Sequence, residues 1–288
     1  MQLDRPIAFT KMSGAGNDFI VIDNRDGAIA EAGRAALFEA WCRRRVGVGA
    51  DGVLLVEPPL GAGADFRMRY YNADGREAES CGNGARCIAR YAHSIGAAPA
   101  SLAFETEAGL YRASMTDEGV ILSMSDPHSL RLGVPVAIEG VPGGKVDFIN
   151  TGVPHVVIFV EDLERAPVET LGRAIRRHPA FAPAGTNVNF ARALGGDRVA
   201  IRTYERGVEA ETLACGTGSV ASALIAHLHG LADPPVSIQT SGGPILRIHF
   251  TPPADPASGL FSGVKLEGEA RVVYQGTLAP EPAAAGGR

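Results

Sequence analysis

The sequence predicts an α+β protein built from two similar halves. Many short strand-like segments and few helices favour this class over a doubly wound parallel sheet. Two segments of the form Cys-Gly-x-Gly, beginning at Cys81 and Cys215, each run into a helix-like stretch, and they lie nearly half the chain apart. No short repeat of fixed period is present, which argues against a solenoid. We therefore expect an internal duplication with its boundary in the Pro- and Gly-rich stretch 126–144.

Two helices and a series of short strands are expected in the first half. Apolar residues at helical spacing predict helices over 33–45, with Leu37, Trp41 and Val46 on one side, and over 83–95, directly after Cys81. Runs of apolar or alternating residues predict the strands. These strands are expected at 7–11, 19–23, 53–57, 66–71, 102–106, 109–115 and 120–124.

The second half repeats this rhythm around one prominent helix. That helix is expected over 216–229, directly after Cys215. The strands of this half are expected at 146–150, 156–160, 186–190, 198–204, 236–240, 245–250 and 263–275. From residue 277 onward the chain consists mainly of Pro, Ala and Gly, so a disordered tail is expected there.

Composition and charge argue against several classes of partner. The formal net charge of −5 and the scattered basic residues argue against nucleic acid and against an anionic membrane surface. No apolar run approaches the roughly 18 residues of a membrane span, and the first residues do not resemble a signal peptide. Four cysteines are too few for a secreted disulfide framework, so a reducing cytoplasm is the expected location.

The two glycine-flanked cysteines are the strongest candidates for chemistry. A thiol at a helix start lies beside exposed N–H groups and the positive end of the helix dipole, which should lower its pKa. Glycines let a ligand approach the backbone closely. A substrate carboxylate could therefore bind to the N–H groups that open the two helices, which are those of Gly82, Asn83, Gly216 and Thr217.

Such a pair suits the inversion of an amino acid at its α-carbon. One thiolate removes the α-proton while a thiol on the opposite face donates another, and bound carboxylate oxygens ease the removal. No pyridoxal phosphate is needed for this reaction, and no cofactor is expected. The only lysines are Lys11, Lys145 and Lys265, none in a convincing cofactor site.

The remaining cysteines and histidines do not suggest a metal. Cys42 and Cys87 are expected to be small buried apolar residues. The seven histidines form no compact cluster with the cysteines, so a metal site is not expected.

Polar residues near the two motifs are further candidates for the site. Arg206 could bind a carboxylate through two parallel hydrogen bonds, and Glu205 could bind an ammonium group. His155 taken alone is more typical of a structural histidine. The other polar candidates lie in turn-like or alternating segments, at Asn17, Asn72 and Asn187.

Together these segments resemble the diaminopimelate epimerase family, whose members epimerise an amino acid without pyridoxal phosphate. The matching segments follow the family order, and the two Cys-Gly-x-Gly segments with Glu-Arg-Gly are highly specific in combination. They are 11–19 (KMSGAGNDF), 47–52 (GVGADG), 72–75 (NADG), 81–87 (CGNGARC), 152–155 (GVPH), 186–190 (TNVNF), 204–207 (YERG) and 214–218 (ACGTG).

The resemblance implies two pseudo-symmetric halves, each a curved, mostly antiparallel sheet wrapped around a central helix, with the active site in a cleft between them. The halves would comprise 1–127, with 268–277 returning to it, and 128–267, followed by a tail over 278–288. A homodimer is also implied. The implied reaction is conversion of LL-diaminopimelate to the meso form, for lysine and peptidoglycan synthesis.

The resemblance also implies a role for each candidate residue. Cys81 and Cys215 would be the two bases, and His155 and Glu205 would assist near the reacting centre. Gly82-Asn83 and Gly216-Thr217 would bind the reacting carboxylate. The non-reacting end of the substrate would be held by Asn17, Asn72, Asn187 and Arg206.

Two departures from the family pattern leave other functions open. Many members have Asn where this chain has Val153, and some have Gln where it has Gly52; both changes remove polar groups that could contact the substrate. A racemase of another amino acid, such as histidine, is therefore an alternative. Four cysteines and seven histidines also leave open a thiol redox or metal-binding module without catalytic function.

Overall fold

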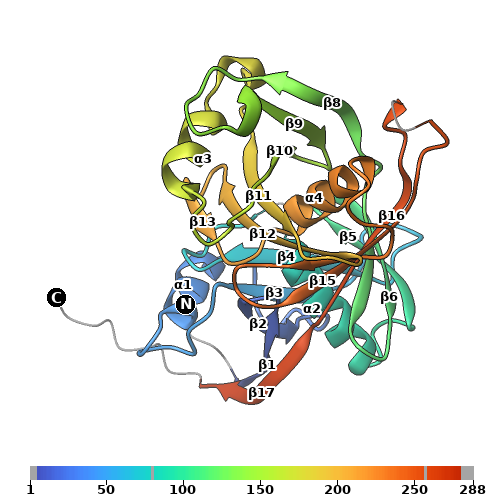
Figure 1. Cartoon of the computed structure of the whole chain (residues 1–288). Coiled ribbons are helices and arrows are strands. Elements are labelled where there is room, and N and C mark those ends of the chain that lie inside the picture. The colour runs from blue at the N-terminus through green and yellow to red at the C-terminus, as the bar shows by residue number, and fades with distance from the viewer. Residues whose placement is uncertain (1–4, 79–80, 256–257, 280–288) are drawn as a thin grey trace. The chain divides into compact units, whose positions relative to one another are not determined.

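The computed structural model describes residues 5–78, 81–255 and 258–279. The chain forms two compact units, one of Met1–Leu122 with Gly268–Arg288 and the other of Ser123–Glu267. We call them unit 1 and unit 2. In the residues that the structure describes, both units combine a curved mixed sheet with two α-helices, which makes the protein α+β as expected (Figure 1). Within the described part of the chain, no helix is long and apolar enough to cross a membrane.

The sheet of unit 1 is mixed, with mostly antiparallel neighbours. Its order is β17-β1-β2-β3-β4-β5-β6-β7, and only the β2–β3 and β4–β5 pairs are parallel. The strands are β1 (Ile7–Gly14), β2 (Asn17–Asp23), β3 (Gly52–Glu57), β4 (Phe66–Asn72), β5 (Ser101–Thr106), β6 (Gly109–Met115), β7 (Val120–Ser123) and β17 (Arg271–Leu278).

Helices cover both faces of the central strands β2 and β3. Consecutive residues of these strands are therefore buried and apolar instead of alternating with polar ones. Helix α1 (Arg34–Cys42) packs with Ile20, Ile22, Val53 and Leu55 in one core cluster. Helix α2 (Gly82–Ser94) contacts β1, β2, β3, β4 and β6. The start of α2 is thereby held against the sheet.

The sheet of unit 2 has a similar mixture of strand directions. Its order is β8-β9-β10-β11-β12-β14-β15-β16, with β13 beside β12, and only the β10–β11 and β12–β14 pairs are parallel. The strands are β8 (His128–Pro135), β9 (Lys145–Asn150), β10 (Pro154–Phe159), β11 (Asn187–Ala193), β12 (Arg198–Glu205), β13 (Ala210–Thr212), β14 (Val236–Gln239), β15 (Ile245–Thr251) and β16 (Ser262–Gly268).

Strand alternation in unit 2 separates an apolar face from a partly polar one. Val156, Val188 and Tyr204 pack with helix α3 (Val168–Arg176) in one core cluster, so their neighbours along each strand lie on the other face. Helix α4 (Gly216–Leu228) contacts strands β9 to β12, β14 and β15. Two single-turn helices, Pro142–Gly144 and Pro179–Phe181, complete the described part of the unit.

Both cysteine-led helices and most strands confirm the sequence prediction, but several elements differ. The expected helix over 33–45 ends at Cys42, and Val46 is exposed rather than packed with Leu37. The expected strand 263–275 is two strands, β16 and β17. Strand β8 lies in the stretch that was predicted to be a boundary. It was not predicted as a strand because its mostly exposed residues show no alternation of apolar and polar side chains.

Helix α3 and the end of β17 were also missed. Gly172 breaks the helical signal of α3, yet a Cβ at this position would lie 2.6 Å from Cβ of Tyr204, so close packing requires glycine there. Strand β17 pairs with β1 as far as Leu278, which is buried, so the expected tail begins later than residue 277. The expected disorder of residues 280–288 falls outside the described residues.

Candidate functional site

Cys81 is the N-cap residue of α2. Its backbone is extended, and its Sγ accepts a hydrogen bond from the backbone N–H of Gly84 at 3.5 Å. The side chain is partly exposed, at a helix start that presents the N–H groups of Gly82 and Asn83. A sulfur in this position is stabilised as an anion by the helix dipole and by the N–H donor.

Cys215 caps α4 in the same way. Its Sγ accepts from the N–H of Gly218 at 3.4 Å and lies 3.6 Å from Oγ1 of Thr217. Unlike Cys81, this thiol is buried. Each unit therefore carries one cysteine whose sulfur, rather than an oxygen, caps a helix.

The fourth residue of each motif is glycine, and packing requires a glycine only in the second motif. A Cβ on Gly218 would overlap Oδ1 of Asn189 and lie 3.2 Å from Sγ of Cys215. A Cβ on Gly84 would lie 3.3 Å from Leu54 and 3.5 Å from Phe19. At Gly82, by contrast, a Cβ would meet no atom of the described residues within 4 Å, so among these residues the second position of this motif leaves room for a ligand.

Burial dominates the electrostatics of Cys215. Together with the smaller effect of the Glu205 carboxylate, burial raises the pKa of this thiol to about 12, against hydrogen bonds from Thr217 and Gly218 that lower it. Burial also raises the pKa of Glu205, whose Oε2 accepts from Thr212 at 2.9 Å. The lowered pKa expected from the helix start is wrong for this thiol, because the loss of water outweighs the helix-start donors.

Around Cys81, a directed chain of hydrogen bonds holds Asn17 and Asn83. The guanidinium of Arg86 donates to Oδ1 of Asn83 at 2.7 Å, Nδ2 of Asn83 donates to Oδ1 of Asn17 at 2.8 Å, and Nδ2 of Asn17 donates to Asp51 at 3.0 Å. Since Arg only donates and a carboxylate only accepts, the orientation of both amides is determined.

Arg86 is fully buried, and burial lowers its pKa. Besides Asn83, it donates to the carbonyl oxygens of Gly82 (3.5 Å) and Glu269 (3.4 Å). Arg86 therefore ties the first turn of α2 to the segment before β17. Sequence reasoning missed its role, although it belongs to the motif that begins at Cys81.

Asn72 lies at the end of β4 with an exposed side chain. Its Oδ1 accepts from the hydroxyl of Tyr70 at 2.7 Å. Burial raises the pKa of Tyr70, and the charge of Cys81 raises it further, so this phenol stays protonated and donates to Asn72.

In unit 2, the ends of three neighbouring strands bring the predicted polar residues together. His155 of β10 pairs in register with Asn187 of β11, and β12 ends at Glu205. Asn187 donates to the carbonyl oxygen of Pro154 at 3.1 Å and accepts from the backbone N–H of Arg206 at 2.8 Å. The guanidinium of Arg206 donates to the carbonyl oxygen of Ala184 at 3.0 Å.

His155 is fully buried and contacts α4 rather than solvent. Its Nε2 lies 2.9 Å from Oγ1 of Thr217, and its Nδ1 lies 3.1 Å from Nδ2 of Asn189. Burial, together with the smaller effect of the Arg206 charge, lowers the pKa of His155 to about 3. The imidazole is therefore neutral at physiological pH.

The other cysteines and the first lysine have structural roles. Cys42 and Cys87 are buried as expected, and burial raises the pKa of their thiols to about 11 and about 12. Lys11 is buried, forms an ion pair with Asp18 at 2.8 Å and donates to the carbonyl oxygen of Gly49. Among the described residues, no group of His, Cys, Asp and Glu is placed to hold a metal ion.

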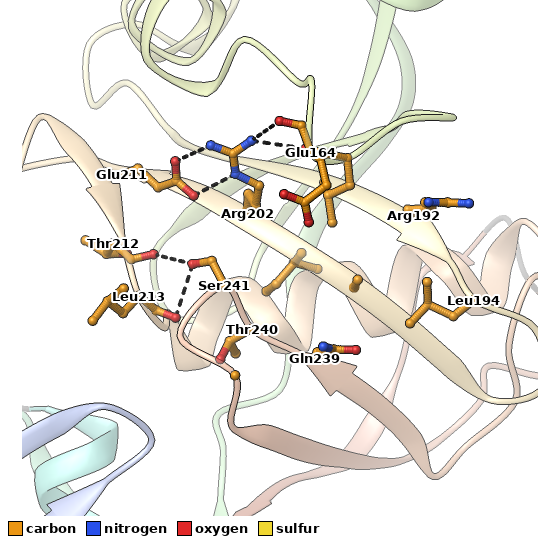
Figure 2. A pocket seen from close by; sticks show the side chains of 14 residues that line it. Glu164, Arg192, Leu194, Arg202, Glu211, Thr212, Leu213, Gln239, Thr240 and Ser241 are labelled. Atoms are coloured by element: carbon orange, nitrogen blue, oxygen red, sulfur yellow. Dashed lines mark hydrogen bonds and ion pairs between the residues drawn. The ribbon is translucent and has the colours of Figure 1, made fainter.

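A hollow of about 670 Å³ lies on unit 2 beside β12 and the 239–243 turn (Figure 2). Arg202 at its edge forms two hydrogen bonds with Glu211, of 2.8 and 2.6 Å. None of the residues predicted for the site lines this hollow, although Thr212, which donates to Glu205, does.

Comparison with known proteins identifies the family. The diaminopimelate epimerase family model matches residues 9–130 and 148–251. The chain belongs to the diaminopimelate epimerase family. It is 41% identical to the diaminopimelate epimerase of Aquifex aeolicus over 95% of this chain and 98% of that protein. It is 44% identical to the diaminopimelate epimerase of a Hydrogenobaculum species, over 94% and 98%.

A solved structure supports the fold at lower sequence identity. The crystal structure of a Bacillus anthracis phenazine biosynthesis protein of the PhzF family aligns with a TM-score of 0.68 at 16% identity, over 96% of this chain and 99% of that one. At this identity the likeness concerns the fold alone.

Within this family, the glycine at position 52 has a packing explanation. A Cβ on Gly52 would overlap the carbonyl oxygen of Tyr71 and lie 2.7 Å from the ring of Tyr70. Gly52 and Asn72 are partners in the β3–β4 ladder, so the close approach is part of the sheet itself. A longer side chain here would require the ring of Tyr70 to move, and with it the hydroxyl that donates to Asn72.

Proposed function

We propose that this chain converts LL-2,6-diaminopimelate into its meso isomer by inverting one α-carbon, with Cys81 and Cys215 as the acid–base groups. Membership of the diaminopimelate epimerase family supports the reaction. The observation that carries the assignment of the thiols is that each one caps a helix and accepts a backbone hydrogen bond, from Gly84 and from Gly218.

The proposed reaction conserves protons and needs no cofactor. A thiolate takes the α-proton and becomes a thiol, while the other thiol gives its proton to the opposite face of the carbanion and becomes a thiolate. Negative charge that develops on the substrate carboxylate is stabilised by N–H groups at a helix start. The open space beside Gly82 supports this role for the first turn of α2.

In this proposal Cys215 rests as a thiol. Burial and the carboxylate of Glu205 both disfavour its thiolate at neutral pH. When Cys215 has given up its proton, the donors that stabilise its sulfur are the N–H of Gly218 and the hydroxyl of Thr217. Glu205, whose Oε2 accepts from Thr212, is proposed to assist near Cys215 through its negative charge.

The remaining candidates are proposed to position the substrate. Asn17 and Asn72 are held by fixed partners in unit 1, and Asn187 and Arg206 are linked to each other in unit 2. Preorganised amides and a guanidinium suit the ammonium and carboxylate of a non-reacting end. His155 is proposed to act as a neutral hydrogen-bond donor rather than as a base.

The test is proton NMR of the reduced protein with LL-diaminopimelate in D₂O. We expect loss of the α-proton signal together with appearance of the meso isomer. Cys81→Ser and Cys215→Ser should each lower turnover by orders of magnitude with an unchanged circular dichroism spectrum. Cys42→Ala, which removes a thiol from the core, is the matched control and should remain active.

Each unsuccessful result has a distinct meaning. Full activity in either serine variant would overturn the assignment of the thiols. Exchange with another amino acid and none with diaminopimelate would keep the two-thiol chemistry and reject the substrate, with Val153 as the first position to examine.

We also propose that the two units arose by internal duplication. The order β1, β2, α1, β3, β4, α2, β5, β6 has a counterpart in β9, β10, α3, β11, β12, α4, β14, β15. The support lies in the pairing directions: antiparallel, parallel, antiparallel, parallel and antiparallel pairs follow one another in both series.

A homodimer in a reducing compartment such as the cytoplasm completes the proposal. Two reduced thiols are needed for the chemistry, which an oxidising compartment would not preserve. Support for a dimer is the exposed apolar row Val272, Val273 and Tyr274 on β17. Analytical ultracentrifugation tests it: Val273→Glu should shift a dimer toward monomer, and a monomeric parent protein would reject the idea.

A further inference from the structure

Five side chains in unit 2 form one hydrogen-bonded series that ends at Cys215. Thr203 of β12 lies opposite Asn189 of β11 in the sheet register, and its hydroxyl is 2.9 Å from Oδ1 of Asn189. Asn189 contacts His155, His155 contacts Thr217, and Thr217 contacts the sulfur of Cys215. Thr203, Asn189 and His155 are almost completely buried, so water cannot substitute for these partners.

The orientation of the Asn189 amide is determined by its partners. Its nitrogen lies 2.9 Å from the backbone carbonyl oxygen of Val156, which can only accept a hydrogen bond. Nδ2 therefore faces Val156, and Oδ1 faces the hydroxyl of Thr203. The same Nδ2 also lies 3.1 Å from Nδ1 of His155.

The tautomer of His155 follows from that orientation. An amide nitrogen can only donate, so Nδ1 of His155 must accept and carries no proton. The neutral imidazole therefore has its proton on Nε2, which donates to Oγ1 of Thr217 at 2.9 Å.

The direction of the Thr217 hydroxyl follows in turn. Its oxygen already accepts from His155, so its own proton is available to another acceptor, and a Cys215 thiolate, which can only accept, makes Thr217 the donor. The sulfur of Cys215, 3.6 Å away, is such an acceptor, and this distance is within the range for a hydrogen bond to sulfur. The backbone N–H of Gly218 is the second donor to the same sulfur.

We propose that Asn189 is a positioning residue that fixes the Nε2–H tautomer of His155 and thereby directs the Thr217 hydroxyl proton at the sulfur of Cys215. For its catalytic consequence this rests on the proposed function of Cys215. The hydroxyl would stabilise the Cys215 thiolate each time that sulfur has given up its proton.

This hydrogen bond matters because the other influences on Cys215 oppose the thiolate. Burial and the negative charge of Glu205 raise the pKa of the thiol, whereas Thr217 and Gly218 lower it. The charged group that acts on His155 is Arg206, and it favours the neutral ring that the series requires. Hydrogen bonds to a charged group are among the stronger ones in proteins, so losing this one should slow turnover by about 10- to 100-fold.

The clearest test reads the tautomer directly, by nitrogen NMR of protein labelled at histidine. The unmodified protein should show Nδ1 of His155 unprotonated and Nε2 protonated. Asn189→Asp keeps the size of the side chain but replaces the donor by an acceptor, and it should move the proton to Nδ1. A proton on Nδ1 in the unmodified protein, or an unchanged tautomer in Asn189→Asp, would overturn the proposal.

Kinetics test the second half of the series. Thr217→Ser keeps the hydroxyl and should retain a clearly higher kcat than Thr217→Val, whereas Thr217→Val and Asn189→Asp should lower kcat by about 10- to 100-fold with a smaller change in KM. Ser222→Ala is the matched control, because Oγ of Ser222 lies buried in the same helix and, within the described part of the chain, has no hydrogen-bond partner.

The outcomes separate this proposal from the proposed function. An inverted tautomer with unchanged kcat would reject the link from His155 to Cys215. If the chain does not epimerise diaminopimelate at all, the tautomer measurement still decides the role of Asn189. If Asn189→Asp does not fold, the comparison of Thr217→Ser with Thr217→Val still decides whether the hydroxyl proton serves Cys215.

Discussion

Adding one methyl group to each Cys-Gly-x-Gly motif should have very unequal effects on the stability of the two units. Gly84 and Gly218 hold the same place in their motifs, and both donate to the sulfur that caps their helix. In a helix, alanine is favoured over glycine by about 1 kcal/mol. Any difference between Gly84→Ala and Gly218→Ala therefore reports on what surrounds each site.

The surroundings differ sharply. The new methyl of Gly84→Ala would lie 3.3 Å from Leu54 and 3.5 Å from Phe19, so small side-chain movements accommodate it. The methyl of Gly218→Ala would overlap Oδ1 of Asn189, whose amide makes three buried hydrogen bonds. Overpacking costs about 1–3 kcal/mol, and a buried polar group that loses its partner costs a similar amount.

We therefore expect Gly218→Ala to lower the free energy of unfolding by about 2–4 kcal/mol. Gly84→Ala should change it by less than about 1 kcal/mol in either direction. Urea unfolding followed by circular dichroism measures both, with epimerase activity recorded on the same samples. Equal midpoints for the two variants would refute the argument that the Asn189 amide is fixed against α4.

Three further predictions address other parts of the molecule. Between pH 6.5 and about 3 the unfolded chain binds a proton at His155 that the folded protein does not bind, so this residue should make the free energy of unfolding decrease as the pH is lowered, by up to about 1.4 kcal/mol per pH unit. Urea titrations of His155→Gln at several pH values should show a smaller dependence on pH. An unchanged dependence would contradict burial of the neutral ring. Gly52→Ala should lower the free energy of unfolding by about 1–3 kcal/mol, because the new Cβ would overlap the carbonyl oxygen of Tyr71. A melting temperature equal to that of the parent protein would contradict this prediction. Arg86→Met should lower the unfolding free energy by about 1–3 kcal/mol, since the buried Oδ1 of Asn83 loses its donor; a neutral result in urea would mean that Asn83 finds another partner.

The sequence by itself determined the features that depend on neighbouring residues. The starts of α2 and α4 were predictable because a cysteine followed by glycines and an apolar helix is a local pattern. The alternation of Asn187, Val188 and Asn189 also indicated a strand with one polar face, and Val188 does lie in the apolar cluster on the other face. The family motifs are likewise short runs of adjacent residues, so the sequence alone reveals them.

Tertiary structure decided the features that depend on residues far apart in the chain. Helix α3 contains a glycine because Tyr204 packs against it, and no local signal reports that contact. Asn189 acquires its role only where Thr203, His155 and Val156 meet it. The pKa of Cys215 reverses the expectation from its helix start, because desolvation depends on everything that packs around the sulfur. Burial and side-chain direction arise from the assembled core, so no stretch of the sequence specifies them alone.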